Sequence, residues 1–405
     1  MKRTLLYLMP FLSVALLFTS TNPLLAQASP TEVAHTNQEL VNIQDVAVVN
    51  NRAYLAVGVL GLKILDVSNP TNPATLNPQV SNANPNTIGV TVAGNYAYMA
   101  CDTNGFHIYN ISNPANPVPV GHNQTTSLVN GVAVSGNYAY LANNQAGLTV
   151  VSISNPANPV TVGNVPLSNS PYNKYASGVA ISGKYAYLAA WTDGLCIYDI
   201  SDPTHPTRVS QTTTNAFTAK SVAVSGNYAY VADYQSGLSV FDISNPANPV
   251  NVGHTNSAAT TDGNPIHIAV SGNYVYLTGI YSRMYIYDVS NPANPVGVAS
   301  SAQQNGWAYC AAIAGNYAYV GNSYDGLHVL FLGIPVPPRL NMQHTKTSTI
   351  ISWPAPSANF VVQQNPGMSS NNWQTLTNRP MLVSGQNQIT LPASPNPLFY
   401  RLKSQ

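Results

Sequence analysis

Short apolar runs of strand length alternate with polar turns over most of this chain. Residues 131–163 show the pattern once, with strand-like runs at 131–134, 138–142, 148–153 and 160–163. A Ser-Gly-Asn sequence separates the first two runs, and Ser-Asn-Pro-Ala-Asn-Pro separates the last two. Gly-Asn favours a tight hairpin, and proline removes the amide donors that a continuing strand would need. The pattern therefore predicts four consecutive antiparallel strands.

Both turn sequences recur down the chain. Ser-Asn-Pro-Ala-Asn-Pro-Val occupies residues 112–118, 154–160, 244–250 and 290–296, with drifted copies at 68–73 and 201–206. Gly-Asn-Tyr-Ala-Tyr and its variants end at Tyr54, Tyr98, Tyr140, Tyr187, Tyr230, Tyr276 and Tyr319, in steps of 44, 42, 47, 43, 46 and 43 residues. Seven copies with this period are typical of a propeller. We therefore predict an all-β protein with a seven-bladed β-propeller of four-stranded blades at residues 29–333.

The two ends of the repeat region complement each other. The seventh repeat has a third strand near residues 326–332 but then turns into prolines, without a fourth strand. Residues 30–37 (Pro-Thr-Glu-Val-Ala-His-Thr-Asn) match the fourth strand of the fifth repeat at residues 249–256. We therefore expect residues 30–37 to complete blade seven, which would remove open sheet edges and tie the two ends of the ring together.

The composition changes after the repeats. Residues 334–338 are rich in proline and predict a linker, and residues 339–405 contain five or six alternating strand-like runs. This segment predicts a small β-sandwich, and it resembles the fibronectin type III modules found at the ends of secreted bacterial proteins.

The repeat sequences resemble a known family. The phrases at residues 222–233 (Val-Ala-Val-Ser-Gly-Asn-Tyr-Ala-Tyr-Val-Ala-Asp) and 237–250 are similar to those of the LVIVD-repeat family of exported and cell-surface β-propellers. The resemblance covers about residues 41–333. It implies a propeller fold and a location outside the cytoplasm, and it supplies no catalytic residues.

Residues 1–28 have the features of a secretory signal peptide. Lys2 and Arg3 precede an apolar stretch, and Ala-Gln-Ala at residues 26–28 forms a small-residue cleavage site. The apolar run is short for a membrane span, which needs about 20 residues. We expect cleavage after Ala28, no membrane span in the mature chain, and a secreted, periplasmic or cell-surface protein.

Charge and cysteine content exclude several functions. Only 7% of the residues are charged and the formal net charge is +1, so the chain lacks the clustered cations that nucleic acid requires. Cys101, Cys196 and Cys310 occupy unrelated blade positions, which predicts buried thiols rather than disulfides. We expect a monomer that binds no nucleic acid.

No catalytic, metal or cofactor site is predicted. The eight histidines are scattered without ligand spacing, and no Ser/His/Asp set can be assembled. Asp66, Asp199, Asp242 and Asp288 recur at the end of the third strands, where Asn110 and Ser152 also occur. All three residue types can cap a turn, but serine is a poor metal ligand, so turn capping is the better interpretation.

The candidate binding residues lie on one face of the ring. The loops between second and third strands should share a face with the loops that join consecutive blades, and we call this the variable face. In blades four to seven its loops carry aromatic residues, and aromatic rings beside carboxylates and amides suit a sugar or a peptide. The candidates are Trp191, Asp193, Asp233, Tyr234, Tyr281, Arg283, Trp307, Tyr324 and Asp325.

Three functions fit the sequence. The first is a non-catalytic binding protein that recognises a polysaccharide or a surface protein through the variable face. The second is a hydrolase or lyase, which would need Asp193, Asp233 and Asp325 to converge. The third is a structural spacer in a surface assembly.

Overall fold

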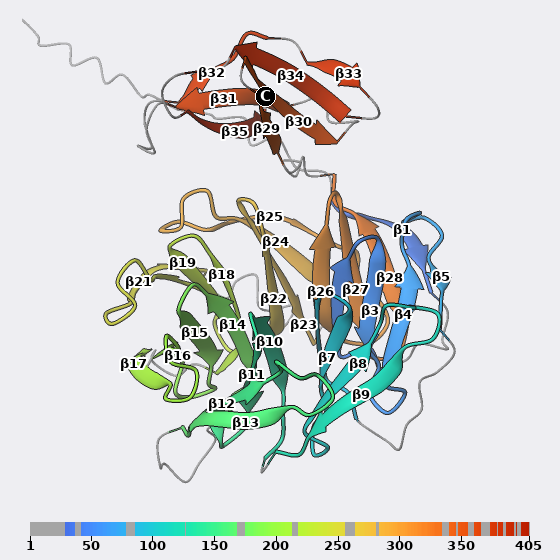
Figure 1. Cartoon of the computed structure of the whole chain (residues 1–405), viewed down its shortest axis with the longest axis vertical. Helices are drawn as coiled ribbons and strands as arrows, with labels where there is room; N and C mark the ends of the chain where they lie inside the picture. The colour runs from blue at the N-terminus through green and yellow to red at the C-terminus, as the bar shows by residue number, and fades with distance from the viewer. Residues whose placement is uncertain are drawn as a thin grey trace, which may run out of the picture.

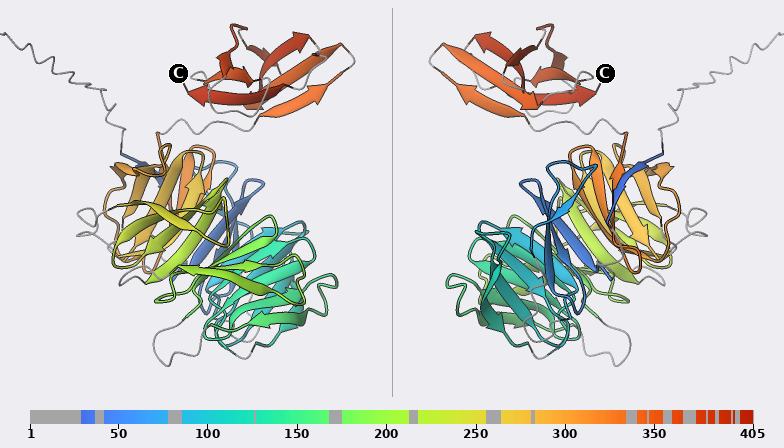
Figure 2. Two further views of the ribbon diagram at one scale, coloured as in Figure 1. Left: turned by 90° about the vertical axis from the view of Figure 1, so that its left-hand side faces the viewer. Right: turned by 90° about the vertical axis from the view of Figure 1, so that its right-hand side faces the viewer.

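The protein is an all-β molecule in which a ring of seven sheets is followed by two small sheets (Figures 1 and 2). The structure is a computed structural model. It describes residues 29–36, 42–77, 86–125, 127–167, 175–212, 218–255, 264–280, 283–333, 340–345, 347–354, 360–365, 373–378, 380–383, 386–392, 394 and 398–404. The predicted signal peptide and linker lie outside these residues. Within them, no helix has the length and hydropathy to cross a membrane.

Each of the first six blades is a four-stranded antiparallel meander in chain order. Blades one to three comprise β2 (Asp45–Val49), β3 (Arg52–Ala56), β4 (Leu62–Asp66), β5 (Ala74–Thr75); β6 (Gly89–Ala93), β7 (Tyr96–Ala100), β8 (Phe106–Asn110), β9 (Val118–Asn123); and β10 (Gly131–Ser135), β11 (Tyr138–Asn143), β12 (Gly147–Ser152), β13 (Val160–Val165). Blades four to six comprise β14 (Gly178–Ser182), β15 (Tyr185–Ala189), β16 (Leu195–Asp199), β17 (Thr207–Thr212); β18 (Ala219–Ser225), β19 (Tyr228–Asp233), β20 (Gly237–Asp242), β21 (Val250–His254); and β22 (Pro265–Ser271), β23 (Tyr274–Gly279), β24 (Met284–Asp288), β25 (Val296–Ser300). The predicted four-stranded repeat is confirmed.

Blade seven combines strands from both ends of the repeat region. Its sheet has the order β1-β28-β27-β26, with β1 (Thr31–His35), β26 (Ala308–Ala314), β27 (Tyr317–Asn322) and β28 (Leu327–Phe331). Glu32 pairs with Leu330 and His35 with His328, and the Thr36 amide donates to the Leu327 carbonyl at 3.0 Å. The expected pairing of the N-terminal segment with blade seven is therefore present.

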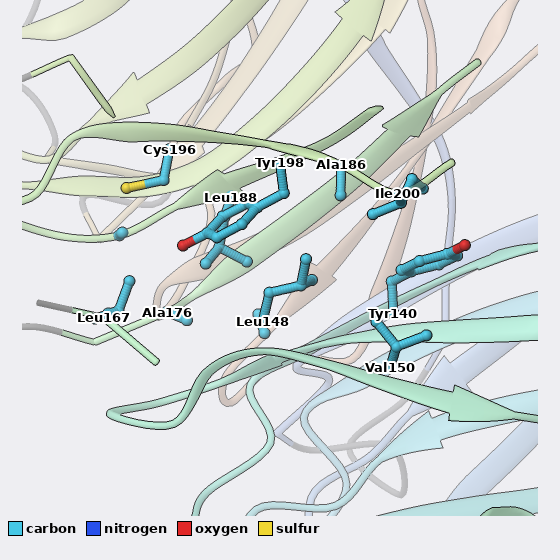
Figure 3. Close-up of a cluster of buried hydrophobic side chains, with 12 residues drawn as sticks. Tyr140, Leu148, Val150, Leu167, Ala176, Ala186, Leu188, Cys196, Tyr198 and Ile200 are labelled. Carbon is cyan, nitrogen blue, oxygen red and sulfur yellow. The ribbon is translucent and has the colours of Figure 1, made fainter. Parts of the chain in front are cut away.

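The blades are joined by apolar interfaces that continue around the whole ring. First strands of consecutive blades lie side by side, and β26 lies beside β2. The second tyrosines of the repeat, from Tyr54 to Tyr319, are all at most 4% exposed. Figure 3 shows one interface, where Tyr140, Leu148 and Val150 of blade three face Leu188 and Tyr198 of blade four. Each blade thus supplies half of two cores, as the tyrosine spacing predicts.

The proline-containing turns also connect neighbouring blades. A Cβ atom on Gly121, in the fourth strand of blade two, would lie 2.0 Å from the Pro156 carbonyl oxygen of the turn in blade three. Gly163 and Gly253 make the same close approach to the turns of blades four and six. The glycine and the turn recur together because each turn packs on the outer strand of the preceding blade.

The aspartates at the ends of the third strands cap the turns that follow them. The Ser244 amide donates to Asp242 Oδ1 at 2.8 Å, and the serines after Asp66, Asn110, Asp199 and Asp288 donate in the same way. These hydrogen bonds lower the pKa of Asp242, with the Ser244 backbone amide as the largest cause. The capping interpretation is confirmed.

The C-terminal part forms two sheets around a separate core. One has the order β29-β30-β34-β33 and the other β32-β31-β35. The strands are β29 (Asn341–His344), β30 (Ser348–Pro354), β31 (Phe360–Asn365), β32 (Gln374–Thr375), β33 (Met381–Val383), β34 (Gln386–Pro392) and β35 (Phe399–Ser404). Ile351 and Trp353 of the first sheet pack with Val362 of the second. The sandwich is therefore present, whereas the fibronectin type III assignment stays a prediction.

Ring closure through β1 predicts a strong effect of N-terminal truncation. A chain that begins at Gln38 lacks β1, exposes the edge of β28 and uncovers part of the core that includes Leu327 and Val329. We expect a clearly lower midpoint of thermal unfolding than for the predicted mature chain, which begins at Ser29. Equal midpoints for the two proteins would contradict closure by β1.

Candidate binding site

The first strands of all seven blades line a cavity on the axis of the ring. Its volume is about 380 Å³. In each blade, one of the lining residues lies six positions before the hairpin glycine, or before Asn50 in blade one. These seven residues directly follow the loops of the variable face, and we call them the mouth ring. The mouth ring consists of Gln44, Ile88, Asn130, Ser177, Lys220, Ile266 and Tyr309. Among the described residues that line the cavity, Lys220 is the one lysine or arginine.

Lys220 lies between aromatic rings from two adjacent blades. Its Nζ is 3.6 Å from the centre of the Trp191 ring and 5.2 Å from the centre of the Tyr234 ring. Tyr175 meets the Trp191 ring edge-on, with 5.1 Å between ring centres. The predicted proximity of the loops carrying Trp191 and Tyr234 is therefore present, but the rings surround a cation. An ammonium group in this position gains about 0.5–2 kcal/mol.

A backbone bridge between blades sets this contact. Trp191 and Ala219 exchange two backbone hydrogen bonds of 3.1 Å, which places the next residue, Lys220, beside the Trp191 ring. The same bridge joins Asp102 to Val129 and Asn144 to Ala176. The site is therefore built on a structural feature that other blades share.

Trp191 adopts an unusual backbone conformation for so large a side chain. Its φ is +42°, and the residues at the same repeat position are Gly58 (+44°), Asp102 (+45°) and Asn144 (+41°). Glycine, asparagine and aspartate tolerate this region, whereas other residues are strained there by about 1–3 kcal/mol. A tryptophan at this position carries a cost that an asparagine would avoid, and strain of this kind is common at binding sites.

Burial changes the acidity of Lys220. Loss of water around the ammonium group lowers the pKa of Lys220 from 10.5 to about 8. The side chain therefore stays mostly protonated at neutral pH, and its charge is only partly hydrated. Such a cation is suited to bind a carboxylate that enters from the variable face.

Two further titratable groups, Asp45 and His267, line the cavity one residue after the mouth ring in their first strands. His267 Nε2 and Asp45 Oδ1 are 3.8 Å apart, and their side chains keep 26% and 22% of their surface exposed where they line the cavity. Burial raises the pKa of Asp45 to about 7 and lowers that of His267 to about 4. The amides of Val46 and Val90 both donate to the Asp45 carboxylate at 2.8 Å, so this group also ties β2 to β6.

The three predicted carboxylates do not form a common site. Asp193 and Asp233 are buried, at 3% and 2% exposed. Asp233 Oδ1 accepts hydrogen bonds from the amides of Thr218 and Gln235, both at 3.2 Å, and burial raises the pKa of Asp233 to about 6. Asp325 instead faces two histidines of blade seven, at distances of 3.4 and 3.6 Å. Asp193 and Asp233 are therefore buried rather than exposed on the variable face.

The remaining candidates are distributed over blades six and seven. Trp307 is 43% exposed, its ring contacts Tyr309 of the mouth ring edge-on, and its amide donates to Ser323 Oγ at 2.8 Å. Tyr324 is 68% exposed and Arg283 is half-buried. Tyr281 lies outside the described residues. Trp307 extends the aromatic surface to the opposite side of the mouth ring, whereas no described contact joins Tyr324 or Arg283 to Lys220.

Comparison with known proteins shows the family. The model of the LVIVD repeat matches seven times, at residues 42–77, 86–125, 128–166, 173–214, 218–257, 262–301 and 305–330. The chain belongs to the LVIVD repeat family. A search of curated proteins found no match.

The LVIVD propeller also resembles solved propellers of low sequence identity. The β-propeller domain of Cps50 (Swd1) from Myceliophteria thermophila has a TM-score of 0.61 and 12% identity, covering 75% of this chain and 99% of that one. The computationally designed protein Ika8 has a TM-score of 0.55 and 10% identity, covering 74% and 99%. A chain of the Mitotic Checkpoint Complex has a TM-score of 0.57 and 10% identity, covering 74% and 90%. At these identities the likeness establishes the fold alone.

Sequence reasoning missed three cavity residues of the LVIVD propeller. It searched the loops for site residues, but Lys220, Asp45 and His267 lie in the first strands, where the other repeats mostly have small or apolar residues. Aligning the repeats on the hairpin glycine would have shown Lys220 at a position where no other blade has a charged residue, and Asp45 and His267 at the next position, which the other blades fill with Gly, Ser or Cys. The sequence signal for these cavity residues was therefore a departure from the repeat at positions in the first strands.

Replacement of Lys220 by methionine tests the buried charge. Because its pKa is lowered in the folded state, Lys220 disfavours folding below pH 8, and this effect decreases as pH rises towards 10.5. We expect Lys220→Met to raise the free energy of unfolding at pH 7, and the gain to shrink at pH 10. Urea unfolding of both proteins at pH 7 and pH 10 measures this difference in the free energy of unfolding. A gain that does not change with pH would contradict the lowered pKa.

Proposed function

We propose that this protein is an exported, non-catalytic binding protein that recognises an acidic polysaccharide at the mouth of its propeller channel. The observation that carries the proposal is the Lys220 ammonium group, held by Trp191 and Tyr234 where the variable face opens into a polar cavity.

The charge and surroundings of Lys220 favour an anionic ligand. A desolvated cation gains more from a carboxylate than a hydrated one does, because the local dielectric constant is low. Uronic acids, which are sugars with a carboxylate, supply this charge together with hydroxyl groups. One donor of each of the mouth-ring residues Gln44, Asn130 and Ser177 already binds within the protein, and their side-chain oxygens can accept hydrogen bonds from such hydroxyls.

The aromatic residues have a role different from the sequence-based expectation. One face of the Trp191 ring is occupied by Lys220, and its edge meets Tyr175. Trp191 therefore acts mainly to position the cation. The exposed ring of Trp307, across the mouth ring, is better suited to lie against a sugar.

An enzyme is the second candidate, supported by Asp45 and His267 in the cavity. A carboxyl group with a pKa of about 7 suits acid–base chemistry near neutral pH. However, both oxygens of Asp45 already accept backbone hydrogen bonds, and the histidine lies beyond hydrogen-bond distance at 3.8 Å. These contacts favour a structural role for Asp45 and hence a binding protein. The third function considered from the sequence, a structural spacer in a surface assembly, would not need the cavity or Lys220.

Binding to polygalacturonate and to its methyl ester tests the proposal. The two polymers differ mainly in carboxylate charge, so we expect the wild-type protein to bind the acid form at least tenfold more tightly. Lys220→Met should abolish this preference, and so should the double variant Trp191→Asn with Tyr234→Ala. Binding of the acid form to the wild-type protein should weaken as pH rises through about 8, because Lys220 then loses its charge. Isothermal titration calorimetry, or an array of acidic and neutral glycans, would measure the affinities.

The matched control is Asp102→Asn combined with Asn144→Gly. These residues lie at the same repeat position as Trp191 in other blades, and both substitutions keep a residue type that tolerates positive φ. We expect the control to bind normally. Loss of binding in the control but not in the Trp191 variant would refute the site. Equal binding of both polymers would refute recognition of the charge, and release of product from either polymer would favour the enzyme.

A further inference from the structure

A second candidate site lies where the N-terminal strand β1 pairs with β28 and closes the ring. We propose that Glu32, His35 and His328 form a binding site for a zinc-like divalent transition-metal ion, which clamps β1 to β28. One ligand atom from each of the three residues lies within 4.8 Å of the others. Two imidazoles and a carboxylate are a preferred ligand set for such ions.

His328 is buried without a normal hydrogen bond. Its side chain is 3% exposed, and in the described part of the chain neither of its ring nitrogens makes a hydrogen bond with normal geometry. Instead, Nδ1 lies 3.2 Å from Glu32 Oε2, and Nε2 lies 3.6 Å from Asp325 Oδ2. A buried imidazole with both nitrogens facing carboxylates needs a proton or a metal ion to balance the charge.

The distances are compatible with a shared ion after a small movement. Ligand atoms of a tetrahedral zinc site lie about 3.3 Å apart, because metal–ligand bonds are about 2.0–2.1 Å long. His328 Nδ1 and Glu32 already have this separation. The His35 ring is stacked on His328 at 4.3 Å with an interplanar angle of 10°, so it must rotate to aim a nitrogen at the same ion. His35 is 33% exposed, and its rotation would exchange the contact between Nε2 and the Asp325 carbonyl oxygen for a bond to the ion.

Asp325 completes the arrangement from the other side of His328. A metal-binding histidine usually donates its second N–H to a carboxylate, which orients the ring. With the ion on Nδ1, Nε2–H points towards Asp325 at 3.6 Å. Asp325 is therefore a positioning residue, and a fourth coordination position stays open to water.

Blade two contains a matched pair without the carboxylates. His107 and His122 occupy the same strand positions and stack at 4.3 Å. Both rings contact the Asn104 carbonyl oxygen, at 3.1 and 3.0 Å. Pro119 and Asn104 stand where blade seven has Glu32 and Asp325. The pair of histidines is thus a shared packing motif, and the two acids distinguish blade seven.

Zinc titration of the predicted mature chain, from Ser29 to its end, tests the site. We expect one high-affinity Zn²⁺ per chain, a higher unfolding midpoint with Zn²⁺ than with EDTA, and slower hydrogen exchange of the β1 amides. Glu32→Gln and His35→Gln change exposed side chains, so both variants should fold, yet lose the zinc-dependent stabilisation. Asp325→Asn should weaken binding by about 10–100-fold.

His122→Gln is the control, because it removes one ring of the blade-two pair. It should keep full zinc binding. Absence of stoichiometric binding in the wild-type protein, or binding that survives both Glu32→Gln and His35→Gln, would overturn the proposal. These outcomes are independent of the polysaccharide site, which contains none of these residues.

Discussion

Each blade of this propeller can bury its apolar faces only against its two neighbours, so the structure depends on closing the ring. The closing interface contains Ile43 and Leu55 of blade one against Tyr319 and Leu327 of blade seven. Pairing of β1 with β28 holds that interface together by joining the two ends of the repeat region in one sheet. Without closure, blades one and seven would each expose half of a core to water.

Closure also creates the two sites. The cavity exists because seven first strands meet around one axis, and Lys220 reaches it because Trp191 and Ala219 bridge blades four and five. The histidine cluster exists because β1 brings Glu32 and His35 to His328 across most of the sequence. In a repeat scaffold with little charge, both sites thus lie where titratable side chains interrupt the repeat.

Sequence reasoning predicted the elements that the repeat itself encodes. The blades, the tyrosine cores and the capped turns follow from period and turn chemistry, which are local, and the closing strand follows from the match of residues 30–37 to residues 249–256. It failed for Asp193 and Asp233 because residue type does not show whether a loop carboxylate faces solvent or caps its own loop. It missed the cluster at His328 because the histidines meet only after closure, and Lys220 because a single charge in a strand has no local signature.

The central claim is that the closed ring holds a desolvated lysine as the recognition group of the variable face. The most direct measurement is the titration of the Lys220 side-chain signal by NMR, assigned by its loss in Lys220→Met. The account predicts a pKa of about 8, together with a shift of the same signal when an acidic saccharide is added. A pKa near 10.5, unchanged by the saccharide, would show that Lys220 is an ordinary solvated lysine and would contradict the account.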